Sequence, residues 1–243
     1  MDYLVLLISI VLGAVTVFGF KLHEPRHIKL LNAFTGAFLL SLTLLHLLPE
    51  LYHIDPTGGG GGSVSPLLLG GLMMAGFFVQ LALDYISMGV EHGHSHALHG
   101  HAPFGVVIGL CIHAFMEATA LGDARTYYDP VSRHMLLLSI VVHKYPVSIA
   151  LLGMLVQWGM RPRNTLGVLA VFAVMAPLGM FLGGHLPFLA SHSRELMAFV
   201  IGIFMHIATT ILFESGDAHR IAGGKVAAII LGTGLGVAVV LLD

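Results

Sequence analysis

Long apolar segments alternate with short polar breaks along the whole chain. A helical membrane span needs about 20 apolar residues, and eight segments approach or exceed that length. They run near residues 3–22, 28–52, 66–90, 103–127, 131–157, 164–189, 193–216 and 222–242. The breaks carry turn-forming or charged residues, such as Asp55-Pro-Thr followed by a run of glycines. The pattern predicts eight membrane-spanning segments joined by short loops.

These segments are expected to be helices. No alternation of apolar and polar positions with a period of two is visible, as a β-barrel would need. Helices satisfy their backbone hydrogen bonds internally within lipid. The sequence therefore predicts an all-α polytopic membrane protein in a lipid bilayer, with one transmembrane domain over residues 1–243. No basic region precedes the first segment, so we expect it to be retained as a span.

Composition supports this class and excludes others. Hydrophobic residues make up 56% of the 243 residues, charged residues only 10%, and the mean hydropathy is +0.90. Soluble domains average roughly 25% charged residues. A net charge of −2 without a basic stripe argues against nucleic acid as a partner. The single cysteine, Cys111, excludes an internal disulfide framework.

Basic residues in the breaks predict the orientation in the membrane, because cytoplasmic loops are enriched in lysine and arginine. The breaks after the first, third, fifth and seventh segments hold Lys21, Arg26, Lys29, Arg161, Arg163, Arg220 and Lys225. The opposite side holds Arg125, Arg133 and Arg194. We therefore expect both termini to be extracytoplasmic and the loop at residues 91–102 to be cytoplasmic.

Five ionisable side chains are expected near the middle of the membrane. His113 and Glu117 lie one helical turn apart on one face of the fourth segment. His143 and Lys144 lie in the fifth segment and His206 in the seventh, at similar depth. Such residues cost about 2.5–3.5 kcal/mol on insertion scales and indicate function by default. The alternative is hydrogen-bonded polar packing.

Imidazole and carboxylate ligands suit Zn²⁺ and other divalent transition metals. We therefore predict a metal site at His113, Glu117 and His143, with His206 as a candidate fourth ligand. The same ligands suit Fe²⁺, Mn²⁺, Co²⁺ or Cd²⁺, so the sequence does not select the ion.

Other polar residues are candidates for steps on a path to and from this site. His46 and Glu50 share one face near the outer end of the second segment, and we assign them to an entry path. Asp84 and Glu214 lie near the cytoplasmic ends of the third and seventh segments, and we assign them to an exit path. The alternative is that these side chains only reach the headgroups by snorkelling.

The loop at residues 91–102 is rich in histidine. Short histidine-rich tracts are typical of metal binding, although metal chaperones and exporters also carry them. Five histidines are candidates for capture of metal ions: His92, His94, His96, His99 and His101.

Four segments resemble motifs of the ZIP (Zrt/Irt-like) family of divalent-metal transporters. Leu45-His-Leu-Leu-Pro-Glu50 resembles the family's second-span motif, and the fourth-span string from Ile112 to Gly122 resembles its His-(x)-Phe-x-Glu-Gly-Leu-Ala pattern. His143-Lys-Tyr-Pro146 resembles its His-Asn-x-Pro pattern, closest to a His-Lys variant. Met175-Ala-Pro-Leu-Gly-Met180 resembles its Pro-Leu-Gly element. The resemblance implies a 3+2+3 bundle, in which spans 1–3 and 6–8 form inverted repeats around spans 4 and 5.

The resemblance also implies a particular metal site. Family members hold two adjacent metals, and the first-site ligands carry over to His113, Glu117 and His143. Residues that are not the usual ligands occupy four second-site positions: Ala114, Lys144, Val147 and Ala176. We therefore expect one metal, with Lys144 supplying the positive charge of the missing second ion. Our hypothesis is that Lys144 and the metal compete for Glu117.

We predict a non-enzymatic transporter that moves a divalent metal, foremost Zn²⁺, into the cytoplasm. The short loops favour a bacterial inner membrane, and the resemblance leaves a homodimer open. One alternative is a ZIP-derived metal sensor that does not transport. Another is a membrane-embedded hydrolase, although the His-Glu-x-x-His and Gly-x-Ser-x-Gly motifs are absent. A third alternative is a cation-diffusion exporter, but that class usually has six spans and a soluble carboxyl-terminal domain, whereas eight spans are predicted here.

Overall fold

The computed structural model describes residues 1–20, 25–52, 64–87, 104–122, 130–214 and 223–241. All regular elements in these ranges are helical. The long helices are α1 (Asp2–Phe20), α2 (Pro25–Leu42), α4 (Pro66–Ser87), α5 (Phe104–Thr119), α6 (Pro130–Gln157), α7 (Pro162–His185), α9 (Ser193–Glu214) and α10 (Gly223–Leu241). Short helices complete the list: the π-helical turn η1 (Thr43–Leu47), α3 (Leu48–Tyr52) and α8 (Pro187–Ser191). The predicted all-α class is confirmed.

Seven of the predicted segments form helices long and apolar enough to cross a membrane. The exception is the fourth, which was expected over residues 103–127 but ends as a regular helix at Thr119. Its apolar part is only Val107–Thr119. The chain then tightens into turns, because the Leu121 and Gly122 amides donate to carbonyls three residues back, at Ala118 and Thr119. The predicted end of this segment was wrong.

The second segment also departs from a uniform α-helix. Between α2 and α3 the backbone widens into the π-helical turn η1, which contains His46. Pro49 is the second residue of α3, and a proline inside a helix removes a backbone donor and crowds the preceding turn. Single π-turns inside α-helices frequently accompany functional sites. The local sequence therefore gives His46 a backbone environment different from that of its neighbours.

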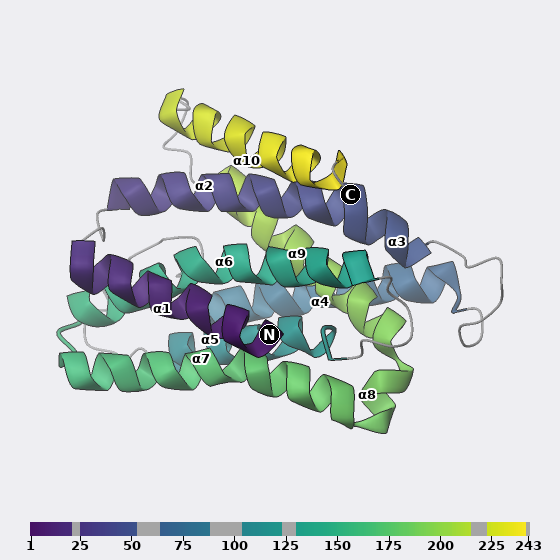
Figure 1. The fold of residues 1–243 in the computed structure, drawn as a ribbon, viewed down its shortest axis with the longest axis horizontal. Helices are drawn as coiled ribbons and strands as arrows, with labels where there is room; N and C mark the ends of the chain where they lie inside the picture. Colours follow the sequence, from purple (N-terminus) through teal and green to yellow (C-terminus); the bar gives the residue numbers. More distant parts are fainter. Residues whose placement is uncertain (21–24, 53–63, 88–103, 123–129, 215–222, 242–243) are drawn as a thin grey trace.

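The long helices pack as two groups (Figure 1). In one group α6 packs against α1, and α5 packs against α7. In the other, α2 packs against α10, and α4 packs against α9. Contacts of α2 with α6 and of α4 with α5 join the groups, and contacts of α2 with α9 hold the second group together. Helix α6 is the innermost, with 72% of its apolar window buried, whereas α10 has only 11% buried.

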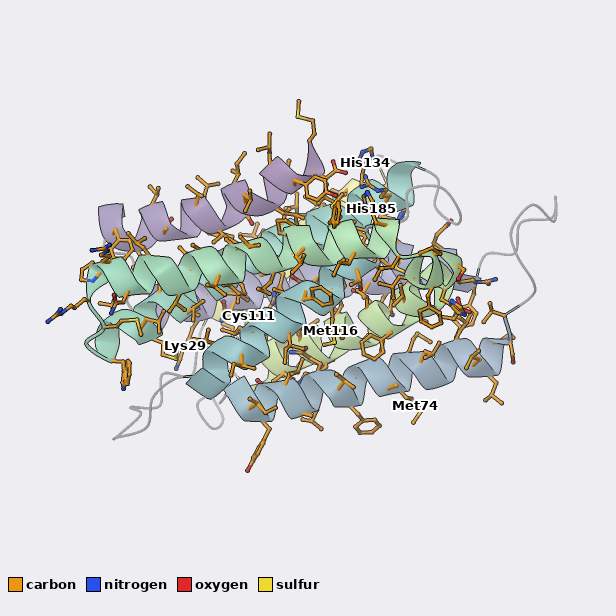
Figure 2. The ribbon with its side chains drawn as sticks, turned by 90° about the horizontal axis from the view of Figure 1, so that it is seen from below. Lys29, Met74, Cys111, Met116, His134 and His185 are labelled. Carbon is orange, nitrogen blue, oxygen red and sulfur yellow. The ribbon has the colours of Figure 1, made fainter. Side chains whose placement is uncertain are left out.

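Apolar side chains project outward from the outer helices, as Figure 2 shows for Met74 of α4. Met74 is 62% exposed, and Phe78 on the same helix is 58% exposed. So continuous an apolar exterior would be unfavourable in water, but lipid tails are as apolar as these side chains. The exterior therefore fits an integral membrane protein.

Glycines permit the closest helix crossings. A Cβ atom added at Gly179 or Gly183 of α7 would overlap the carbonyl oxygen of Phe115 or Thr119 on α5. Such small-xxx-small spacing lets membrane helices approach backbone to backbone. Phe115 and Thr119 lie on either side of Glu117, so this crossing sets the place of the helical turn that carries the glutamate.

Polar contacts tie the helices at one end of the bundle. The Arg133 guanidinium of α6 pairs with Asp2 of α1 at 2.6 Å. Arg194 of α9 donates from Nε and Nη2 to the Leu51 carbonyl of α3, at 3.0 and 2.9 Å. These contacts join segments that are far apart in the sequence.

Candidate metal centre

Two neighbouring helices carry the candidate ligands. Helix α5 presents His113 and Glu117 one turn apart, and α6 presents His143 just before Pro146. Pro146 has no amide hydrogen to donate, so the carbonyl one turn earlier loses its usual helical partner. Membrane helices accept such breaks next to polar sites. Both helices thus bring their polar residues to one level inside the bundle.

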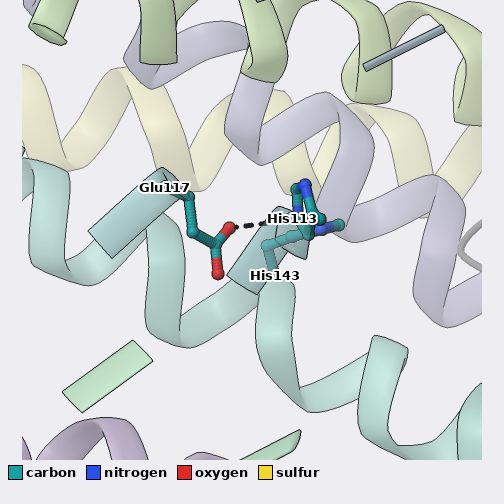
Figure 3. A group of neighbouring side chains, drawn as sticks. All are labelled: His113, Glu117 and His143. Atoms are coloured by element: carbon teal, nitrogen blue, oxygen red, sulfur yellow. Dashed lines mark ion pairs between the residues drawn. The ribbon is translucent and has the colours of Figure 1, made fainter. Parts of the chain in front are cut away.

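The three side chains face one another in the protein interior (Figure 3). Each offers a ligand atom, and the three atoms all lie within 4.8 Å of one another. The His113 Nε2 and Glu117 Oε2 atoms are 3.2 Å apart, and the two imidazole rings meet edge to face with centroids 5.6 Å apart. All three residues are at most 1% exposed. Ligand atoms of a tetrahedral zinc ion lie roughly 3.4 Å apart, given bonds of about 2.0–2.2 Å, so small side-chain rotations would close the group around one ion.

Lys144 lies beside the three candidate ligands. Its Nζ atom donates a hydrogen bond to Glu117 Oε1 and forms an ion pair with that carboxylate. The two side chains are 1% and 0% exposed. The ammonium also lies 5.6 Å from the ring centroid of Phe172 on α7, in cation–π contact. Glu117 therefore has one oxygen toward Lys144 and the other toward His113.

A glutamine that the sequence analysis did not single out also contacts the site. Gln80 of α4 is fully buried, and its Oε1 atom lies 2.8 Å from His113 Nδ1. A polar residue in the middle of the apolar segment 66–90 was the available signal. An uncharged amide is a weaker signal of function in an apolar segment than an ionisable side chain is.

His206 does not join the group formed by His113, Glu117 and His143 among the residues that the structure describes. It lies on α9 against α4 instead. Its Nε2 atom is 3.9 Å from Asp84 Oδ2, and its ring meets Phe77 edge to face with centroids 4.9 Å apart. Thr210 Oγ1 lies 3.4 Å from the same nitrogen. The structure thus brings together a predicted ligand, His206, and a predicted exit-path residue, Asp84.

The remaining candidates are placed to different extents. His46 and Glu50 are half-buried on η1 and α3, and within the described part of the chain the buried His46 Nε2 atom has no hydrogen-bond partner. Glu214 is the last residue of α9, and its side chain lies outside the described residues. The five loop histidines also lie outside them: His92, His94, His96, His99 and His101.

The three side chains could together hold a metal ion. Two imidazoles and one carboxylate are an ordinary donor set for a divalent transition metal. Burial keeps competing water away, and the ammonium of Lys144 opposes the charge of an arriving ion. The fold and this site together define an integral membrane protein with a buried candidate metal centre.

Comparison with known proteins gives the family. Residues 92–242 match the family model described as ZIP zinc transporter, which is more than half of the chain. The chain belongs to the ZIP zinc transporter family. The relatives in this family are named as zinc transporters, a transport family without enzymatic activity.

Individual relatives agree with this assignment. Zinc transporter ZIP9 of Micropogonias undulatus is 28% identical over 179 residues, which is 65% of this chain and 56% of that protein. Zinc transporter ZIP9-B of Xenopus laevis is 26% identical over 170 residues, or 63% of this chain and 55% of that protein. Zinc transporter ZIP9 of Xenopus tropicalis is 27% identical over 174 residues, with the same two shares. The chain spans little more than half the length of the curated relatives it matches.

Proposed function

We propose that this chain moves a divalent transition metal, foremost Zn²⁺, across the membrane into the cytoplasm through one metal site at His113, Glu117 and His143. The buried group of three ligand atoms within 4.8 Å of one another is the observation that carries the proposal. Membership of a zinc transporter family and the zinc-transporting names of the relatives support it. Fe²⁺, Mn²⁺, Co²⁺ and Cd²⁺ are the other candidate ions.

Lys144 would let one metal suffice. Its ammonium already neutralises Glu117 in the absence of an ion, where a second cation would otherwise be needed. An arriving metal must take Glu117 from Lys144, which weakens the bound state. A transport site must bind well enough to fill and weakly enough to empty. Competition between the ammonium and the metal for one carboxylate supplies that balance.

The polar residues outside the site would form the rest of the path. His46 and Glu50 would pass the ion inward from the extracytoplasmic side. His206, Asp84 and Glu214 would receive it on the way out, and the contact between His206 and Asp84 supports a shared role for these two. We now favour this exit role for His206 over a place in the main site. The loop histidines would hold ions at the cytoplasmic mouth.

The helix contacts support a 3+2+3 inverted-repeat plan with eight spans. If spans 1–3 correspond to spans 6–8, then α2 corresponds to α9 and α4 to α10. Under this correspondence the α2–α10 packing is equivalent to the α9–α4 packing, and both are present. With α1 likewise corresponding to α7 and α5 to α6, the α1–α6 packing is equivalent to the α7–α5 packing. A site between repeats is a common transporter plan. The bacterial inner membrane stays a prediction, since the relatives above are vertebrate proteins, and so does the homodimer.

Zinc influx into proteoliposomes tests the proposal. We expect saturable uptake by the purified protein and a loss of at least tenfold in the His113→Ala/Glu117→Ala variant, because two of three ligands are removed. His134→Ala is the matched control, since His134 is an exposed histidine on α6 away from the group. That variant should keep the parent's uptake.

The outcomes separate transporter from sensor. Parent uptake that the double variant retains would overturn the site. Absence of uptake, together with metal bound at His113, Glu117 and His143, would favour the metal sensor that does not transport.

The competition hypothesis has its own test in Lys144→Met, which removes the ammonium and keeps the length of the side chain. We expect Zn²⁺ to bind at least tenfold more tightly, because Glu117 is no longer engaged, and turnover to fall because release slows. Calorimetric titration and single-turnover efflux measure the two quantities. Unchanged affinity and unchanged flux would sink the hypothesis.

A further inference from the structure

Gln80 lies on a helix where a buried polar residue is unexpected. The apolar window of α4 is only 22% buried, and the neighbouring side chains Val79 and Leu81 are 37% and 46% exposed. Gln80 itself is 0% exposed, and its Oε1 atom lies 2.8 Å from His113 Nδ1. An amide buried at this depth is costly unless it is hydrogen-bonded. The bond to His113 is thus a feature that helps to account for a glutamine here.

The bond has a chemical consequence for His113. The Gln80 Oε1 atom is a carbonyl oxygen and only accepts, so Nδ1 must carry the hydrogen that lies between them. A neutral imidazole with its hydrogen on Nδ1 has its lone pair on Nε2. His113 Nε2 is the nitrogen that faces Glu117 at 3.2 Å and lies on the side of the candidate ligands.

We infer that Gln80 is a positioning residue for the metal site: it accepts a hydrogen bond from His113 Nδ1 and thereby selects Nε2 as the metal-binding nitrogen. The inference rests on the proposed metal site. Histidine ligands usually donate their second ring hydrogen to a neighbouring acceptor, and loss of that acceptor typically costs about 10–100-fold in metal affinity. Gln80 meets this description from a helix that contributes no ligand to the group.

The choice of an amide over a carboxylate also follows from the function proposed. A glutamate in this place would increase the basicity of the imidazole and strengthen the metal bond. A transporter must release its ion, and an uncharged acceptor orients the histidine without adding negative charge to a site that already holds Glu117. Gln80 therefore limits affinity as well as orienting the ligand.

Gln80 also links the two helix groups. Helix α4 packs chiefly against α9, and α5 packs chiefly against α7, so the Gln80–His113 bond crosses from one group to the other. The orientation of a ligand on α5 thus depends on where α4 lies. A variant that loses the bond should disturb the site without disturbing the packing within either group.

Two variants of Gln80 test the inference. Gln80→Leu removes the acceptor, and Gln80→Glu keeps an acceptor oxygen at nearly the same volume. We expect Gln80→Leu to weaken Zn²⁺ binding 10–100-fold, and Gln80→Glu to bind at least as tightly as the parent. Ser41→Ala is the control, since Ser41 is buried on α2 and, among the residues that the structure describes, bonds only within its own helix, to the Ala37 carbonyl.

A spectroscopic measurement separates positioning from general loss of structure. In protein labelled with ¹⁵N-histidine, Nδ1 of His113 should be protonated in the metal-free parent, because Gln80 Oε1 accepts its hydrogen. Gln80→Leu should shift this signal toward the Nε2-protonated form, whereas Gln80→Glu should keep Nδ1 protonated. The signal is assigned as the one that disappears in His113→Gln.

The outcomes bear on the inference and on the proposed function separately. Zn²⁺ binding that depends on His113 but is unchanged in Gln80→Leu would overturn the role of Gln80 and leave the metal site standing. Failure of the parent to bind Zn²⁺ would overturn the proposed function, and the ¹⁵N signal of His113 would still decide whether Gln80 selects the tautomer. Equal weakening by Gln80→Leu and Gln80→Glu would contradict the acceptor role.

Discussion

Glu117 and Lys144 are opposite charges that lie inside the protein with almost no exposure. Transferring two ions out of water costs several kcal/mol each, and their attraction offsets this only with good geometry and further partners. Here Lys144 also lies in cation–π contact with Phe172. At this scale each charge depends on the other for its place in the interior.

A double-mutant cycle checks this dependence. Glu117→Gln and Lys144→Met alone should each lower the free energy of unfolding by about 3–5 kcal/mol, because each leaves one charge buried without its opposite. The double variant should be less destabilised than the sum of the two. Unfolding in mixed detergent micelles without added metal measures all four proteins. Strictly additive losses would show that the two charges do not interact.

The crossing of α5 and α7 sets the position of the site at the next scale. Gly179 and Gly183 lie against the backbone of α5 on both sides of the glutamate. No Cβ atom fits between the helices there, so the short distance between the helix axes requires glycine at both positions. By contrast, a Cβ atom added to Gly153 on α6 would have no neighbouring atom within 4 Å.

Two alanine substitutions compare these glycines. Gly183→Ala should destabilise the protein by about 1–3 kcal/mol, as is usual for overpacking, and should weaken Zn²⁺ binding because α5 is displaced. Gly153→Ala should be neutral or gain up to about 1 kcal/mol from higher helix propensity. Unfolding and Zn²⁺ titration of both variants provide the check. A Gly183→Ala protein with parental stability and affinity would contradict the role of the crossing.

At the scale of the whole molecule, the polar contacts at one end of the bundle bear on the predicted orientation in the membrane. Arg133 and Arg194 are two of the three basic residues assigned to the extracytoplasmic side. Both are engaged in contacts within the protein, with Asp2 and with the Leu51 carbonyl. Their role in structure explains their presence on a side that otherwise has few positive charges. The exposed Arg161 and Arg163 at the opposite end have no such role among the described contacts, and they remain the stronger topology signal.

Cysteine accessibility tests this orientation. Cys111 is the single cysteine, so Cys111→Ser provides a background in which new thiols are unique. We expect a cysteine placed by Ser191→Cys to react with a membrane-impermeant maleimide on intact cells, and one placed by Arg163→Cys to react only after permeabilisation. Both positions are exposed: Arg163 lies at the start of α7, and Ser191 lies at the end of α8, which follows α7. The reverse pattern of labelling would invert the predicted direction of transport.

Much of the fold and part of the site followed from local sequence. The apolar runs predicted the helices, since lipid leaves the backbone no other way to satisfy its hydrogen bonds over such lengths. Of the four predicted ligands, His113 and Glu117 are one turn apart on one helix, so their proximity needed only helical geometry. The end of α5 at Thr119 was missed, because apolar residues continue to Leu121 while the backbone has already turned.

The sequence by itself determined the all-helical membrane class, the polar residues that lie inside it, and the absence of the usual ligands at the second-site positions. Only the tertiary structure decided which of those residues meet. It placed Lys144 on Glu117, gave His206 to Asp84 instead of to the main group, and brought Gln80 to His113. The reason is physical: depth and helix face follow from residue spacing within one helix. The rotation of one helix against another depends on the side chains and glycines of both helices, so the sequence of one segment alone does not determine it.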